Sequence, residues 1–485
     1  MAAAFETVIG LECHVELSTR TKMFCGCRNA FGAPPNTNVC PVCLGLPGSL
    51  PVPNEQAIES IVRIGLALGS KIAPDSLFHR KNYFYPDMPK DYQISQYDLP
   101  VCVGGRLEID VDGERRTIGI TRVHMEEDTG KTTHVGAGGR IGQAEYALVD
   151  YNRAGVPLVE CVSEPDLRSA EEARVYLTEL RATLEALGVS DVRMEEGSLR
   201  CDANISTRRA GEAELGTKVE IKNLNSVRSL ERALRFEEER QRTALDRGEP
   251  LIQETRHFDE ETGATHTLRS KEEAFDYRYF PEPDLPPLAP DRAWVEAIRT
   301  SLPELPAARR ERFVSELGLK PEQARILAGA PSTAAFFEET IAFGADPASA
   351  ANWITQDLAG LSNAAKVDLA AGKVTPQHVA DLVGLVADGT ISATGAKQVL
   401  EEAFETGATA GEIVERRGLR QVVDAGALEA WVDEAIAENP GPVEQFRGGK
   451  EGALNAVLGQ VMKKSGGSAN PRAVRELLLE RLSGP

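Results

Sequence analysis

Apolar and polar residues alternate in several short runs within the first 290 residues, and a period of two is typical of β-strands. Glycine and polar turns separate the runs, which include Arg106–Val111, Arg116–Val123, Tyr146–Asp150 and Val219–Ile221. One helix is predicted among them, because Ser169 and Glu172 form a capping box, apolar residues follow at helical spacing and Gly188 ends the pattern. This part of the chain is therefore expected to form an α+β domain.

The pattern changes near residue 290, after a proline-rich segment at 280–287. Beyond it the sequence is rich in alanine, leucine and glutamate and keeps helical periodicity to the end. Short breaks at 372–375, 388–392 and 405–410 separate units of two or three helices, without a fixed repeat. The predicted architecture is an α+β domain followed by helical modules.

Composition places the chain among ordinary soluble proteins. Its 485 residues are too many for one core, and its 42% hydrophobic and 26% charged residues are usual values. No apolar run approaches the roughly 18 residues that cross a bilayer, and the N-terminus lacks the features of a signal peptide. Eight cysteines, four of them clustered, indicate reduced thiols and a cytoplasmic protein.

The net charge of −20 argues against general affinity for nucleic acids. The stretch 442–485 differs, because seven lysines and arginines outnumber four glutamates there and give it a net charge of +3. Such an excess is compatible with ordinary charge on a helix surface and equally with a specific contact to RNA.

Candidate chemistry begins in the alternating run at residues 7–17. An extended backbone places Glu12, His14 and Glu16 on one face and the apolar residues on the other. A half-exposed strand shows the same alternation. A row of two carboxylates and an imidazole can also bind a hard cation such as magnesium or move protons.

Four cysteines in a C-x-C…C-x-x-C pattern follow this run: Cys25, Cys27, Cys40 and Cys43. Thiolates at such spacings converge on a tetrahedral metal, most often zinc, so zinc is favoured over four free thiols. The acidic row and the cysteines together predict two metal sites side by side and an enzyme that handles phosphate.

Two more polar segments extend this picture. The first carries His124 and three consecutive acids at 126–128, which form either a solvated turn or carboxylate ligands for magnesium held with nucleotide phosphates. In the second, at 198–206, alternation gives a polar face that suggests the floor of a site and consists of Arg200, Asp202 and Asn204.

Cations and aromatic residues are mixed at 80–92 and again at 277–284, a combination that suits a stacked base and a neutralised phosphate, or simply an aromatic loop. Nucleotide-binding motifs of the common types are excluded. The segment 211–218 has Walker-like spacing but ends in Gly-Thr-Lys and carries two acids, and the glycine-rich segment 136–142 lacks the dinucleotide-binding spacing.

Motifs along the whole chain resemble the GatB family, one component of the bacterial aspartyl/glutamyl-tRNA(Asn/Gln) amidotransferase. They lie at residues 6–17, 80–87, 124–128, 163–166, 194–204, 222–226 and 276–284, and a stretch typical of the family's tail lies at 459–471. The resemblance implies a cradle-shaped α+β catalytic domain over 1–290 and a helical domain over 291–405. It also implies a small YqeY-like helical tail over 406–485 that contacts tRNA.

The resemblance implies an ATP-dependent carbon–nitrogen ligase. A GatB protein would phosphorylate the side-chain carboxylate of Glu-tRNA(Gln), Asp-tRNA(Asn) or both, and ammonia released from glutamine by the amidase (glutaminase) subunit would displace the phosphate. ATP is needed because a carboxylate is a poor acyl donor, whereas an acyl phosphate has a good leaving group. The expected complex is a heterotrimer of this chain, the amidase and a small third subunit. The alternative is a non-catalytic tRNA-binding scaffold of the same complex.

The family also implies roles for single residues. Magnesium would be held by Glu12, His14, Glu127 and Glu254, with Glu126 as the competitor of Glu127. Lys81 would neutralise phosphate or the substrate carboxylate, and the ATP or activation site would include Arg200, Asp202 and Asn204. The four cysteines would bind a structural zinc that pins their loop. The best candidates for contact with tRNA would be Lys463 and Lys464.

Overall fold

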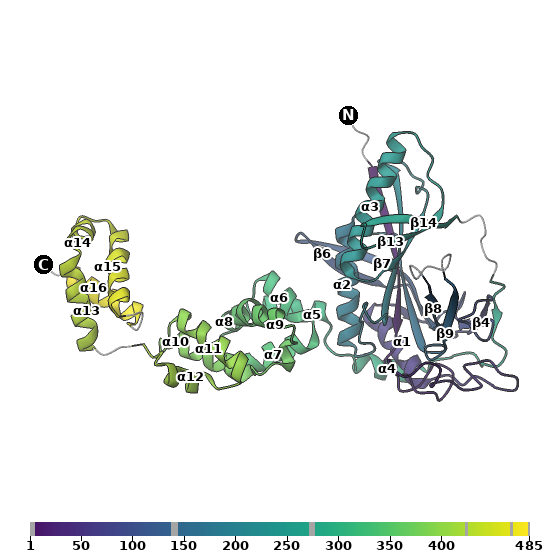
Figure 1. Cartoon of the computed structure of the whole chain (residues 1–485), viewed down its shortest axis with the longest axis horizontal. Coiled ribbons are helices and arrows are strands. Elements are labelled where there is room, and N and C mark those ends of the chain that lie inside the picture. Colours follow the sequence, from purple (N-terminus) through teal and green to yellow (C-terminus); the bar gives the residue numbers. More distant parts are fainter. Residues whose placement is uncertain (1–4, 137–143, 271–276, 422–424, 466–468, 484–485) are drawn as a thin grey trace. The chain divides into compact units, whose positions relative to one another are not determined.

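A computed structural model of the chain describes residues 5–136, 144–270, 277–421, 425–465 and 469–483. The chain divides into two compact units, Met1–Ala307 and Ala308–Pro485. The first unit is a mixed sheet with helices and the second is helical, which confirms the predicted α+β fold class (Figure 1). Most of the glycine-rich segment 136–142 lies outside the described residues.

The main sheet has the strand order β14-β13-β12-β11-β1-β10-β7-β4-β3-β15, in which β1 (Phe5–Glu16) is central. Its other strands are β3 (His79–Asn82), β4 (Tyr92–Ser95), β7 (Glu114–Glu127), β10 (Pro157–Ser163), β11 (Leu199–Arg209), β12 (Val219–Leu224), β13 (Glu254–Asp259), β14 (Ala264–Ser270) and β15 (Phe280–Pro281). The side strands are β2 (Lys71–Ile72), β5 (Cys102–Val103) and β6 (Arg106–Val111), and a separate hairpin is formed by β8 (Lys131–Val135) and β9 (Tyr146–Asp150). The strand runs predicted from alternation all lie in these strands.

Three helices, α1 (Glu55–Ala67), α2 (Ala170–Ala186) and α3 (Val227–Asp246), pack with the apolar face of the sheet in one core. Figure 1 shows α2 and α3 running along the strands. The predicted start of α2 is confirmed, because Ser169 accepts a hydrogen bond from the backbone of Glu172 at 3.1 Å. Helix α2 and β1 bury apolar residues in the same core, so the polar residues of β1 face the opposite side.

The helix α4 (Arg292–Thr300) buries Ile298 in the first core. A second apolar core is built by α5 (Pro306–Ser315), α6 (Pro321–Ala328), α7 (Pro331–Ala342), α8 (Pro347–Asn352), α9 (Ala359–Ala365), α10 (Pro376–Ala387), α11 (Ala393–Thr406) and α12 (Ala410–Arg417), with a π-helix over Trp353–Leu358 and a 3-10 helix over Leu369–Ala371. A third core is built by α13 (Ala425–Glu438), α14 (Pro440–Arg447), α15 (Leu454–Lys464) and α16 (Pro471–Ser483), with a 3-10 helix over Glu451–Ala453.

The boundaries between these cores lie further along the sequence than the breaks in hydrophobic periodicity predict. The first core continues through α4, and the second continues through α12. The assignment of separate roles to residues 1–290, 291–405 and 406–485 stays a prediction. Within the part of the chain that the structure describes, every helix is too short or too polar to cross a membrane.

Candidate active site

One face of the sheet collects polar residues from four neighbouring strands. β1 pairs with β10 and with β11, so that His14 lies opposite Glu160 on one side and Arg200 on the other. β10 pairs in turn with β7, where Glu160 lies opposite His124. Residues that lie opposite each other in paired strands point to the same face, so the register gathers these side chains.

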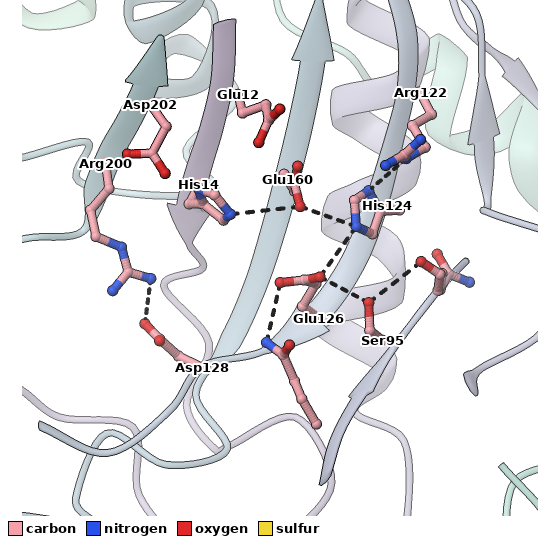
Figure 2. A network of polar contacts seen from close by, with 12 residues as sticks. Glu12, His14, Ser95, Arg122, His124, Glu126, Asp128, Glu160, Arg200 and Asp202 are labelled. Carbon is pink, nitrogen blue, oxygen red and sulfur yellow. Dashed lines mark hydrogen bonds and ion pairs between the residues drawn. The ribbon is translucent and has the colours of Figure 1, made fainter. Parts of the chain in front are cut away.

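Glu160 is the centre of a row of ion pairs and hydrogen bonds across this face (Figure 2). Its Oε2 lies 3.6 Å from His14 Nε2 and 3.3 Å from His124 Nε2, which is also 3.3 Å from Glu126 Oε1. Ser95 donates a hydrogen bond of 2.8 Å to the same Glu126 oxygen. Ligand atoms of His14, Glu126 and Glu160 lie within 4.8 Å of one another, so the three residues can hold a cation together.

The imidazoles and carboxylates of this row stabilise each other's charged forms. Burial lowers the pKa of His124, but hydrogen bonds to Glu126 and Glu160 outweigh burial and raise the pKa to about 9. Burial raises the pKa of Glu160, but hydrogen bonds from His124 and His14 hold it well below its ordinary value. The carboxylates of Glu126 and Glu160 are therefore held in the ionised form.

A second group of charges lies beside this row. Arg200 donates a hydrogen bond of 2.6 Å from Nη2 to Asp128 Oδ2, and Arg153 Nε lies 3.7 Å from the same oxygen. Burial and the neighbouring Asp128 raise the pKa of Glu16 to about 8. Glu16 is thus mostly protonated at neutral pH, while the two guanidinium groups lower the pKa of Asp128 and hold it ionised.

The predicted polar face of segment 198–206 is confirmed in β11. Asn204 donates a hydrogen bond of 2.8 Å to Glu12 Oε1 and thereby orients this carboxylate. Asp202 forms an ion pair with Lys222, whose ammonium group also lies 3.2 Å from Glu220 Oε1. Asp202 is therefore held by a cation and is not a free ligand in this arrangement.

Lys81 in β3 approaches the row from its other end. Burial lowers the pKa of this ammonium group, but Glu126 foremost, together with Tyr279, outweighs burial and raises the pKa. The Nζ atom lies 5.1 Å from the ring centre of Tyr277, and Tyr279 stacks on Tyr97 with ring centres 4.3 Å apart. The structure thus places a cation with aromatic neighbours where the charges of Glu126 and Glu160 act on it.

Two predicted magnesium ligands do not reach this row. Glu127 follows Glu126 in β7, so its side chain points to the opposite face, where it pairs with Lys90 and accepts a 2.8 Å hydrogen bond from the backbone of Ile94. Glu254 shares the face of its strand partner Val219, a core residue, and accepts a hydrogen bond from Arg256 at 2.6 Å. In this arrangement neither side chain reaches His14, and the assignment of both as ligands of one ion with His14 stays a prediction.

The four cysteines converge in the loop between β1 and α1. Their sulfur atoms lie within 4.8 Å of one another, and those of Cys40 and Cys43 are 3.9 Å apart. Zinc with four bonds of about 2.3 Å separates its sulfur ligands by roughly 3.8 Å. The thiols that the spacing predicts to converge therefore do so, at separations that fit zinc.

Comparison with known proteins identifies the family. Residues 7–296 match the GatB/GatE catalytic domain and residues 335–482 match the GatB domain. This chain belongs to the GatB family. It is 52% identical to the GatB subunit of the aspartyl/glutamyl-tRNA(Asn/Gln) amidotransferase from Carboxydothermus hydrogenoformans, over 99% of both chains. GatB proteins of the same name from Anaeromyxobacter sp. (strain K) and Frankia casuarinae are each 55% identical to it, over 99% of this chain and 99% and 96% of theirs.

Membership of the GatB family confirms the family and the ligase-type enzyme class predicted from the motifs. Sequence reasoning missed Glu160, which the structure places at the centre of the row. The signal was a single acid within an otherwise apolar strand, Pro157–Ser163, where a buried charge requires partners. It also missed Lys222 and Arg153, because their partners come from other segments of the chain.

The two tail lysines of this GatB-family chain lie in the last turn of α15. Lys464 Nζ is 2.9 Å from Glu438 and 3.2 Å from Glu434, both in α13. Lys463 is exposed to solvent. The structure therefore separates the two candidates, since Lys464 ties two helices of the third core together while Lys463 extends outward.

Proposed function

We propose that this chain activates the side-chain carboxylate of a tRNA-bound glutamate or aspartate by transferring a phosphoryl group from ATP. The observation that supports the proposal is the row on one face of the sheet, where acids that suit magnesium adjoin cations that suit phosphate. Glu12, His14, Glu126 and Glu160 would hold magnesium. When bound, this ion neutralises charge on the nucleotide phosphates.

Phosphoryl transfer depends on position and on neutralised charge more than on covalent help from the protein. Lys81 approaches Glu126 from β3 and can neutralise the transferred phosphate or orient the substrate carboxylate. Arg200, already fixed by Asp128, can contact a second anionic group of the substrates. The carboxylate attacks the terminal phosphorus, the bond to ADP breaks, and ammonia later attacks the acyl phosphate with release of phosphate.

The remaining parts of the proposal concern partners and the second metal. We infer that the chain works in the cytoplasm in a heterotrimer with an amidase, which supplies ammonia from glutamine, and a small third subunit. Misacylated tRNA(Gln) or tRNA(Asn) is the substrate. A structural zinc held by the four cysteines would fix the loop that follows β1 and thus the position of that strand.

The test is phosphate release from ATP by the reconstituted complex with Glu-tRNA(Gln) and no ammonia donor. Glu12→Gln and Glu160→Gln are compared with wild type, and Glu6→Gln serves as a matched control in the same strand because Glu6 pairs with Arg208, away from the row. We expect tRNA-dependent release in wild type and control and its loss in the two site variants. Equal release by all proteins would remove the row from the mechanism. If the wild-type complex bound tRNA but released no phosphate from ATP, the scaffold alternative would be supported.

A further inference from the structure

Lys22, in the loop after β1, has a buried ammonium group that forms no ion pair with any carboxylate of the described residues. The residue is 1% exposed, and its Nζ lies 3.2 Å from the backbone oxygen of Tyr151 and 3.8 Å from Cys43 Sγ. Among the described acids, none forms an ion pair with it within 4.0 Å. An unpaired buried charge costs several kcal/mol, on the order of the desolvation penalty, so the site needs a compensating anion.

The chain around Lys22 is built to hold the ammonium group at the cysteines. The backbone N–H of Lys22 donates a hydrogen bond of 3.0 Å to the carbonyl oxygen of Cys27. Gly155 lies beside the lysine stem, where a Cβ would stand 3.6 Å from Lys22 Cδ and 3.5 Å from Cys43 Cβ. Both ends of the lysine are therefore fixed, one by the first cysteine pair and the other beside the second pair.

The positive charge of Lys90, a neighbouring buried lysine, is balanced by a carboxylate, unlike that of Lys22. Its ammonium group, in the cleft that Cys43 and Cys25 also line, pairs with the carboxylate of Glu127. Among the described residues, the Lys22 ammonium group contacts a neutral carbonyl and a sulfur atom, and the Glu127 carboxylate, which also lies by Gly155, is already paired with Lys90. The anion that balances Lys22 is thus most simply the sulfur centre itself, since four thiolates around a divalent ion carry a net charge of −2.

We propose that Lys22 donates a hydrogen bond to the metal-bound sulfur of Cys43 and lowers the net charge of the buried centre from −2 to −1. The proposal rests on the zinc site proposed above. Lys22 is a positioning residue for the metal centre and does not take part in phosphoryl transfer. Groups that contact metal ligands in this way commonly change metal affinity by roughly 10- to 100-fold when they are removed.

The test compares zinc affinity of the full-length proteins by competition with a chromogenic chelator. Lys22→Met removes the charge and the donor groups, whereas Arg20→Met removes an exposed positive charge from the same loop as a matched control. We expect one zinc per wild-type chain, a roughly 10- to 100-fold weaker affinity in Lys22→Met, and wild-type affinity in the control. Cobalt in place of zinc gives a second readout, because loss of a hydrogen bond to the sulfur shifts the sulfur-to-cobalt charge-transfer band.

The outcomes separate the two proposals. A wild-type chain that takes up no zinc would overturn the zinc site, and this inference with it. If wild type binds zinc, and Lys22→Met has the same zinc affinity and the same cobalt spectrum, the role of Lys22 is overturned while the zinc site stands. A lysine that merely anchors Tyr151 would destabilise the metal-free protein on substitution and leave zinc affinity unchanged. If Lys22→Met does not fold, Lys22→Gln keeps a donor, loses the charge and is expected to weaken zinc binding as well.

Discussion

Glu16 shows how one buried carboxyl group makes stability depend on pH. It lies two residues beyond His14, beside Asp128, and its pKa rises from an ordinary value near 4.5 to about 8 because of burial and that neighbour. A carboxyl group with a raised pKa stabilises the fold at low pH, and this contribution is lost as pH rises from about 4.5 to about 8. The cost of keeping this carboxyl group buried therefore grows from about pH 4.5 and reaches its full size above about pH 8.

We predict that Glu16→Gln stabilises the protein relative to wild type at pH 9 and not at pH 5, because the amide stays neutral. The difference in free energy of unfolding between the two proteins should change by on the order of 2–4 kcal/mol over this range. Chemical denaturation at both pH values checks it, with Glu6→Gln near the start of β1 as the control. A difference that is the same at pH 5 and pH 9 would contradict the raised pKa.

At the scale of the strand, the alternation of side chains along β7 places two adjacent acids on opposite faces of the sheet. Glu126 belongs to the row with His14, whereas Glu127 pairs with Lys90 on the other face. We predict that Glu126→Gln weakens magnesium or manganese binding at least about 10-fold, while Glu127→Gln leaves the ion's affinity unchanged and destabilises the fold by about 3–5 kcal/mol because Lys90 loses its partner. Manganese titration with nucleotide, followed by denaturation, checks both parts. Weaker manganese binding in Glu127→Gln alone would place the ion on the other face.

A helix contact gives a prediction that is independent of the chemistry. Gly65 of α1 packs on β5, and a Cβ at this position would stand 2.4 Å from Cys102 Sγ and 3.2 Å from Ile72 Cδ1. Gly65→Ala should therefore destabilise the protein by about 1–3 kcal/mol through overpacking. The double variant with Cys102→Ala should recover much of this loss, because the sulfur atom is gone. Denaturation of both single variants and the double variant checks the coupling, and strictly additive effects would speak against the contact.

These elements also show how far sequence reasoning reaches. The polar face of β1 and the start of α2 were predictable because alternation and capping are local properties of the chain. The convergence of four thiols was predictable from their spacing. The choice between Glu126 and Glu127 depended on which face of β7 meets β1 through β10, and sequence alone does not supply that register. The burial of Lys22 was not predictable, because segments distant in the sequence create it, such as the one that carries Tyr151.

At the scale of the whole molecule, the proposed function requires a strongly acidic chain to bind the polyanion tRNA. The net charge is −20, and the proposed contact with tRNA rests on the modest positive excess of the C-terminal segment. The structure shows that part of this excess is already used within the protein, since Lys464 pairs with Glu434 and Glu438, and Arg481 lies near Glu429 and Asp433. Exposed Lys463 is therefore the stronger candidate for a phosphate contact.

We predict that Lys463→Ala weakens tRNA binding by the complex and reduces by about 1 the slope of the logarithm of affinity against the logarithm of salt concentration, because one phosphate contact is lost. Lys464→Ala should change tRNA affinity less, since its charge is already balanced by two glutamates of α13. Filter binding at several salt concentrations checks both, with Lys373→Ala in the second unit as a control. If Lys464→Ala instead had the larger effect, tRNA would have to break the contact between α13 and α15, and the Glu434→Gln, Glu438→Gln double variant would then bind tRNA more tightly than wild type.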